Sequence, residues 1–147
     1  RSGRVTGVQT CALPISFTID NSAGTTPINS ISFIDELPVG LLVADNPNIS
    51  FGCSSMTVTA DPGSSTITVN PTVFGQVNLN AGEICTISVD VVASTSGSLA
   101  NVTQNFSYSN TVFQILNCCF ASATLEVLTP PEIFIQKRFT TNPVRPG

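Results

Sequence analysis

The sequence lacks several of the residues on which enzymes commonly rely. Its 147 residues include no histidine, no tryptophan and only one tyrosine, and charged residues make up 10% of the chain. A typical soluble domain has roughly 25% charged residues. Catalytic triads and most general-base designs use histidine as their central member, and that member is missing here. We therefore expect that the protein is not an enzyme.

Basic residues are absent from most of the chain. The five Lys and Arg residues lie near the two ends, and all nine acidic residues lie between Asp20 and Glu132. Because phosphate backbones and anionic lipid surfaces are bound through Lys and Arg, we expect neither nucleic acid nor a membrane as a partner. No run approaches the roughly 20 apolar residues that cross a bilayer. Any export signal or anchor is therefore expected outside this stretch.

Residues 1–15 are expected to be foreign to the fold. The text VTGVQTCALPI, from Val5 to Ile15, resembles the conceptual translation of a common short-read sequencing adapter. Segments of this kind are set aside before the fold is considered, and Cys11 is set aside with them. The alternative is a native strand that contains Val8 and Leu13.

From Ser16 onward, short apolar or β-branched runs alternate with turns rich in Gly, Pro and Asn. These runs predict strands at residues 16–20, 30–35, 40–45, 49–53, 56–60, 65–69, 83–94, 99–109 and 121–128. Since successive side chains of a strand point to opposite faces, Phe17 and Ile19 share one face and Cys85 points into the core. We predict one all-β domain, an immunoglobulin-like antiparallel β-sandwich of about seven to eight strands.

Four cysteines remain once Cys11 is set aside. A disulfide between Cys53 and Cys85 is the simplest use of the two, and it would contribute very roughly 3 to 4 kcal/mol in an oxidising compartment. Zinc is the competing interpretation, but the paired C-x-x-C knuckles of such sites are absent from the sequence. Cys118 and Cys119 are adjacent, so they form a vicinal bond, pair outside the chain or stay free. We expect a structural or incidental role for them.

Several segments together carry a family resemblance. They are FTIDNS (17–22), DELPVGLLVA (35–44), the lone Cys53, AGEICTISVDV (81–91) and the stretch from Gly97 to Asn101. From about Phe17 to Val127 the chain resembles tandem immunoglobulin-like repeats of unknown function in bacterial secreted or wall-associated proteins. The resemblance implies a disulfide between Cys53 and Cys85. The region from Asn110 to Phe120 departs from the family's usual small polar sequence.

The same resemblance divides the chain. Residues 16–130 form the repeat module, and residues 131–147 form a linker and the first strand of the next repeat. We expect Ile133–Phe139 either to extend away as a linker or to fill a vacant sheet edge, as in donor-strand assembly. Lys137 is also a candidate for a Lys–Asn isopeptide bond, as in some surface adhesins. The body of its own repeat is missing, so that bond is not expected to form normally.

The acidic residues offer two further alternatives. Asp35 and Glu36 could be the paired carboxylates of a glycosidase, but they read more simply as a loop after a strand. Calcium bound between domains would use oxygen ligands such as Asp20, Asp35 and Asp90, which are scattered, and the sequence contains no D-x-D-x-D-G loop. We expect no cofactor and no metal site.

These observations favour a non-catalytic spacer or stalk repeat of an extracellular or cell-surface protein. Its expected partners are neighbouring repeats of the same chain. One alternative is an adhesin-type module that binds a surface glycan or protein. The other is a subunit of an extracellular fibre joined by strand exchange.

Overall fold

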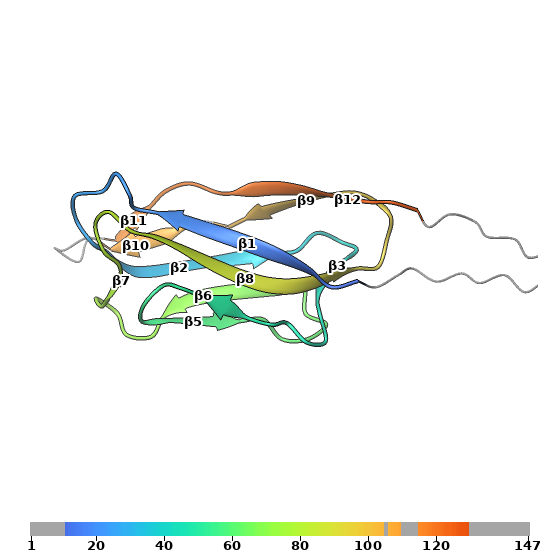
Figure 1. Cartoon of the computed structure of the whole chain (residues 1–147), viewed down its shortest axis with the longest axis horizontal. Coiled ribbons are helices and arrows are strands. Elements are labelled where there is room, and N and C mark those ends of the chain that lie inside the picture. Colours follow the sequence, from blue (N-terminus) through green and yellow to red (C-terminus); the bar gives the residue numbers. More distant parts are fainter. Residues whose placement is uncertain (1–10, 105, 110–114, 130–147) are drawn as a thin grey trace, which may run out of the picture.

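The computed structural model describes residues 11–104, 106–109 and 115–129. These residues form twelve strands, β1 to β12, in antiparallel pairs within two sheets that pack face to face (Figure 1). The described part contains no helix, and so no helix that could cross a membrane. The fold is the immunoglobulin-like antiparallel β-sandwich that the sequence predicts. Twelve strands exceed the seven to eight expected. The nine runs predicted from the sequence become twelve strands, because the run at 99–109 is divided and two short strands were missed.

The smaller sheet is built around β8 (Ile84–Ala93). On one side β8 pairs with β1 (Leu13–Asp20), with Phe17 opposite Ile87. On the other side it pairs with β3 (Leu41–Val43) and β4 (Ser50–Phe51). β1 begins three residues before Ser16, so Leu13 to Ile15 pair with β8 although they belong to the adapter-like text. Their foreign origin stays a prediction.

The larger sheet is built around β2 (Ile28–Glu36). One side of β2 carries β6 (Thr66–Pro71) and β7 (Val77–Leu79), with β5 (Met56–Thr59) beyond β6. The other side carries β9 (Gly97–Thr103) and β10 (Ser107–Ser109). Beyond them lie β12 (Ser122–Val127) next to β9 and β11 (Ile115–Asn117) next to β10.

The core lies between the inward faces of the two sheets. The alternation predicted for β8 is confirmed, because Cys85, Ile87, Val89 and Val91 are all buried. Ile31 and Phe33 of β2 face them from the larger sheet, together with Ile67 and Val69 of β6. Burial of apolar area at about 25 cal/mol per Å² is the main stabilising contribution to such a core.

A disulfide between Cys53 and Cys85 crosses this core, with the two Cα atoms 5.2 Å apart. Cys85 belongs to β8 in the smaller sheet. Cys53 lies in the connection between β4 of the smaller sheet and β5 of the larger one. The bond therefore fixes the point at which the chain passes from one sheet to the other.

The strands run along the long axis of the molecule (Figure 1). β1 starts at the same end of this axis at which β12 finishes. This follows from the pairing, because β2 runs opposite to β1, β9 is antiparallel to β2, and β12 is antiparallel to β9. The described part of the chain thus enters and leaves at one end of the sandwich.

Candidate functional site

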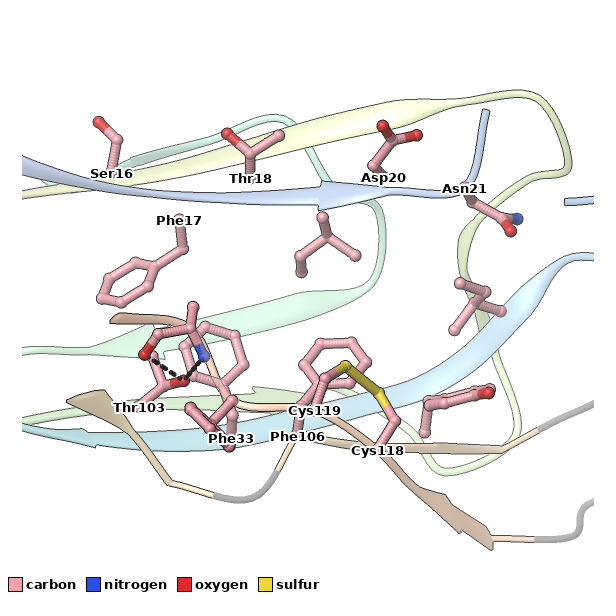
Figure 2. Close-up of a pocket in the computed structure, with 15 residues that line it drawn as sticks. Ser16, Phe17, Thr18, Asp20, Asn21, Phe33, Thr103, Phe106, Cys118 and Cys119 are labelled. Atoms are coloured by element: carbon pink, nitrogen blue, oxygen red, sulfur yellow. Dashed lines mark hydrogen bonds between the residues drawn. A yellow bond between two sulfur atoms is a disulfide. The ribbon is translucent and has the colours of Figure 1, made fainter. Parts of the chain in front are cut away.

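A groove of about 450 Å³ lies between β1 and the facing edge of the larger sheet (Figure 2). β1 and the turn that follows it form one wall. Phe106, Tyr108 and the segment from Cys118 to Ala121 form the other wall. Figure 2 shows the Phe17 side chain pointing into this space, whereas Ser16 and Thr18 point away from it. The sandwich is therefore open along this edge in the part of the chain that the structure describes.

Aromatic side chains form the floor of the groove. The ring centroids of Phe17 and Phe33 are 5.3 Å apart, those of Phe33 and Phe106 are 6.1 Å apart, and those of Phe106 and Tyr108 are 5.9 Å apart. These separations lie in the favourable range for aromatic pairs. Phe120 adds a ring at the rim that is 74% exposed. The groove thus offers an apolar surface to another chain.

The rim is held in place by backbone hydrogen bonds. The Ala121 N–H donates to the Thr103 hydroxyl at 2.7 Å, and the Thr103 N–H donates to the Ala121 carbonyl at 2.9 Å. The Cys118 N–H donates to the Phe106 carbonyl at 3.0 Å. Cys118 and Cys119 are joined by a vicinal disulfide, which is the first of the three states that the sequence left open. The rim is thereby tied to β9 and to Phe106.

β1 is an edge strand of the smaller sheet. It pairs with β8 along all of its eight residues, and no strand among the described residues pairs with its other side. Half of the N–H and C=O groups of such a strand point outward and can pair with an added strand. Backbone pairing at an exposed edge, with pockets for alternate side chains, is a common way to bind an extended peptide. The edge and the groove beside it form one candidate docking site.

A second polar feature lies inside the sandwich. Asp35 of β2 is fully buried and Asn101 of β9 is 7% exposed. The Asn101 Nδ2 donates to Asp35 Oδ2 at 2.7 Å. Burial raises the pKa of the Asp35 carboxyl above its ordinary value, and the hydrogen bond from Asn101 opposes this only in part. A polar pair therefore occupies a position where the strand pattern calls for apolar side chains.

The acidic residues considered for calcium do not come together. Asp20 lies exposed at the end of β1, where hydrogen bonds from the Ser22 hydroxyl and N–H lower its pKa. Asp90 accepts a hydrogen bond from the Asn48 Nδ2 at 2.7 Å, and Asp35 is enclosed in the core. Among the described residues, no group of three or more His, Cys, Asp or Glu could hold a metal ion.

Asp35 and Glu36 differ from their expected setting. They are the last two residues of β2 rather than a loop, because Asp35 pairs with Ile67 and Glu36 pairs with Thr66. The strand turns Asp35 inward and leaves Glu36 exposed, so the two carboxyl groups do not face one space.

The structure describes the two predicted disulfide cysteines but not the predicted lysine. Cys53 and Cys85 are joined in the core. Lys137 and the whole segment from Ile133 to Phe139 lie outside the described residues. The sequence analysis gave Asn101 no role in the core, although it shares one face of β9 with Leu99 and Thr103, and that face points inward.

The comparisons with known proteins agree with this fold. A family model described as a domain of unknown function (DUF7933) matches residues 6–127. No curated protein matches the sequence significantly. The collagen-binding domain of a Staphylococcus aureus adhesin has a similar structure, with a TM-score of 0.55 and 14% sequence identity over 78% of this chain and 87% of that one. At this identity the likeness shows a shared fold. The chain belongs to the family of domains of unknown function called DUF7933.

Proposed function

We propose that this domain is a spacer repeat in a stalk that a secreted protein presents at a cell surface. The observation that carries this proposal is the disulfide between Cys53 and Cys85, which fixes the passage of the chain between two sheets whose strands all follow the long axis. A cross-linked sandwich of this kind resists bending and local opening. Disulfides persist in oxidising compartments, which supports a location outside the cell.

The spacer role is tested by joining two and three copies of the chain in tandem and measuring their maximum dimension by small-angle X-ray scattering. We expect this dimension to grow by a constant increment for each added copy, and this increment should be nearer to the width of the sandwich than to its length, because the described chain enters and leaves at one end of the long axis (Figure 1). Growth that follows the square root of the number of copies, typical of a flexible chain, would contradict the proposal.

A binding role is the second candidate, and the aromatic groove favours it. The similar Staphylococcus aureus domain is named for collagen binding, and the groove beside β1 offers apolar surface of the kind found in ligand sites. Saturable binding to immobilised collagen or to a glycan array would support this role. We expect Phe120→Ala, at the rim, to weaken such binding. Phe51→Ala is the control, since Phe51 is an exposed ring on β4.

Fibre assembly by strand exchange is the third candidate, and it is favoured by the outer edge of β1, with which no strand of the described residues pairs. A segment from a neighbouring copy would pair with β1 and cover the groove. Analytical ultracentrifugation should then show association that rises with concentration and disappears when residues 131–147 are deleted. A chain that stays monomeric at every concentration would contradict assembly of this kind.

A further inference from the structure

A small pocket lies on the larger sheet, on the side of β2 that faces away from the core. Its volume is about 140 Å³, whereas one water molecule needs roughly 10 to 15 Å³. Residues of β2, β6, β10 and β11 form its walls, together with the connection between β6 and β7. Among the described residues that line it, none carries a charge. The pocket is therefore neutral and has room for a group larger than water.

The strand pairing places a set of polar side chains on this face. Ser107 and Ser109 are two residues apart on β10, so their side chains share a face, as do directly opposite residues of antiparallel strands. Ser32 lies opposite Ser107, and the two hydroxyls are hydrogen-bonded at 2.7 Å. Asn29 lies opposite Ser109. Since Phe33 follows Ser32 and points into the core, the shared face is the outer one.

Two polar atoms on this face have no partner. Ser109 is fully buried and Asn29 is 5% exposed, yet Ser109 Oγ and Asn29 Oδ1 lack a hydrogen-bond partner in the part of the chain that the structure describes. Leaving such atoms without a partner costs free energy, so native proteins satisfy nearly all of them. A hydroxyl group can accept one hydrogen bond and donate another. A ligand hydroxyl beside Ser109, which lines the pocket, would accept from Ser109 and donate to Asn29.

β2 is irregular where it borders the pocket. Ser30 has a φ of 51°, and the register of β2 shifts beside it against both β7 and β10. The Ser30 Oγ accepts a hydrogen bond from the Gly75 N–H at 2.7 Å, which holds the connection that carries Phe74. Phe74 is 60% exposed, and Ile115, opposite Ser109 on β11, is 62% exposed. Both line the pocket, so the polar face has apolar flanks.

We propose that this pocket binds a pyranose residue of a neutral glycan. Sugar hydroxyls donate and accept hydrogen bonds, as the unpartnered atoms require, and the C–H face of the ring packs on apolar side chains such as Phe74 and Ile115. An acidic sugar would lose water from its carboxylate without gaining a counter-charge from the neutral lining. This site goes beyond the spacer role, and it is separate from the aromatic groove beside β1.

The pocket lies far from the end at which the chain enters and leaves the sandwich. β7, β10 and β11 lie at one end of the long axis, whereas β1 starts and β12 finishes at the other (Figure 1). Neighbouring repeats of a stalk would join at the second end. Each repeat would therefore present its own pocket to the surroundings.

The first test titrates the whole chain with methyl glucoside, methyl galactoside and methyl mannoside and follows the amide chemical shifts by NMR. We expect saturable shifts with at least one sugar, largest at the amides of Ser30, Ser32 and Ser109. The uronide of the best-binding sugar is the matched control, because it differs by one carboxylate, and it should bind at least about tenfold more weakly. The absence of saturable shifts with all three sugars would overturn the proposal, and equal binding of the uronide would overturn the preference for a neutral glycan.

The second test removes the unpartnered hydroxyl. Ser109→Ala deletes no hydrogen bond among the described residues, so its melting temperature should equal or exceed that of the wild type. We expect its dissociation constant for the sugar to rise about tenfold. Ser122→Ala, at an exposed position on β12, is the matched control and should change neither quantity.

The third test removes an apolar flank. Phe74→Ala should weaken binding roughly fivefold, because the exposed ring no longer packs on the sugar. Phe51→Ala removes an exposed ring of the smaller sheet and should leave the affinity unchanged. Equal affinities of these two variants would overturn the packing of the sugar on Phe74.

The outcomes separate this pocket from the other proposals. Shifts confined to Phe106, Tyr108 and Cys119 would place the sugar in the aromatic groove and overturn the pocket. Unchanged binding by Ser109→Ala, or a lowered melting temperature together with lost binding, would overturn the assignment of the Ser109 hydroxyl to a ligand. The scattering measurement on tandem copies tests the spacer role without any sugar, so either proposal can fail while the other stands.

Discussion

Asn78 on β7 joins three segments of the larger sheet through one side chain. Its Oδ1 accepts a hydrogen bond from the Ile31 N–H at 2.7 Å, and its Nδ2 donates to the carbonyls of Ser54 and Ser55 at 2.9 Å each. Ser55 has a φ of 53°, a conformation that side chains other than glycine adopt reluctantly. Asn78 is 2% exposed, so it connects β2 to the turn after Cys53 where water does not compete.

Asn78→Ala should destabilise the domain strongly. The change leaves the buried Ile31 N–H without its partner, which costs about 1 to 3 kcal/mol. It also removes two bonds to the carbonyls of the exposed residues Ser54 and Ser55, so we expect a total loss of about 2 to 4 kcal/mol. Denaturation in urea measures it. Asn70→Ala, at an exposed position on β6, is the matched control and should cost less than about 1 kcal/mol. Equal losses would contradict the role given to Asn78.

Asp35 should make the stability of the domain fall as the pH rises. Its pKa in the folded chain lies above the ordinary value of 3.8, because burial disfavours the charged carboxylate. The folded state therefore holds the proton more tightly, and this stabilisation is present below the ordinary pKa and lost as the pH rises through the folded one.

Asp35→Asn removes this dependence while keeping the size of the side chain. We expect the variant to gain stability relative to the wild type as the pH is raised from about 3 to about 7, as measured by thermal unfolding. Ile34→Val, at an exposed neighbour that carries no titratable group, should leave the shape of the pH profile unchanged. Parallel profiles for the wild type and Asp35→Asn would contradict a raised pKa.

At the scale of elements, the two disulfides differ in the length of chain that they close. Cys53 and Cys85 are 32 residues apart, whereas Cys118 and Cys119 are adjacent. The loss of chain entropy in the unfolded state grows with the closed loop, so the first bond should contribute about 3 to 4 kcal/mol and the second only about 1 kcal/mol.

Paired substitutions test this contrast. The double variant Cys53→Ala with Cys85→Ala should lower the free energy of unfolding by about 3 kcal/mol or more. The double variant Cys118→Ser with Cys119→Ser is the matched control. It removes a disulfide that closes no comparable loop, so we expect a loss of about 1 kcal/mol. A larger loss from the second pair would mean that the rim of the groove supports the fold.

The sequence predicted most strands because their alternation is regular, as in β8. It missed β7 and β11, which are three residues long and carry little alternation. The strand expected at residues 99–109 is divided after Thr103, where the Gln104 N–H donates to the Ile34 carbonyl at 2.7 Å. Such breaks depend on contacts between strands distant in sequence, which local patterns do not contain.

The candidate site was less predictable than the fold. Alternation on β2 places Asp35 on the same face as Ile31 and Phe33, so its burial could be read from the sequence. Its partner Asn101 could not be paired with it, because the pairing of β2 with β9 joins segments more than sixty residues apart. The groove beside β1 likewise depends on how two sheets lie against each other.

At the scale of the whole molecule, charge is divided between the body and the C-terminal segment. The described residues include acidic side chains but no Lys or Arg, whereas residues 131–147 carry Lys137, Arg138 and Arg145. The acidic body of one copy and the basic C-terminal segment of another carry opposite charges, which should speed and strengthen their association at low salt.

Association through the C-terminal segment should therefore weaken as salt rises from about 0.05 M to about 0.5 M, because screening shortens the range of attraction between exposed charges. Sedimentation at a series of salt concentrations measures this. The variant Arg138→Gln with Arg145→Gln should show a smaller dependence. Association that strengthens with salt would indicate a contact driven by apolar surface alone.

The position of the two ends has a consequence for how the domain would bear a pulling force. With β1 starting and β12 finishing at one end of the long axis, tension applied to the two ends would peel edge strands away one hydrogen bond at a time. A strand added antiparallel to β1 would start at the opposite end. Tension between its start and the end of β12 would then pass along the strands and load their hydrogen bonds together, in shear. Whether a strand is added to the outer edge of β1 thus determines whether the sandwich unzips or holds under load.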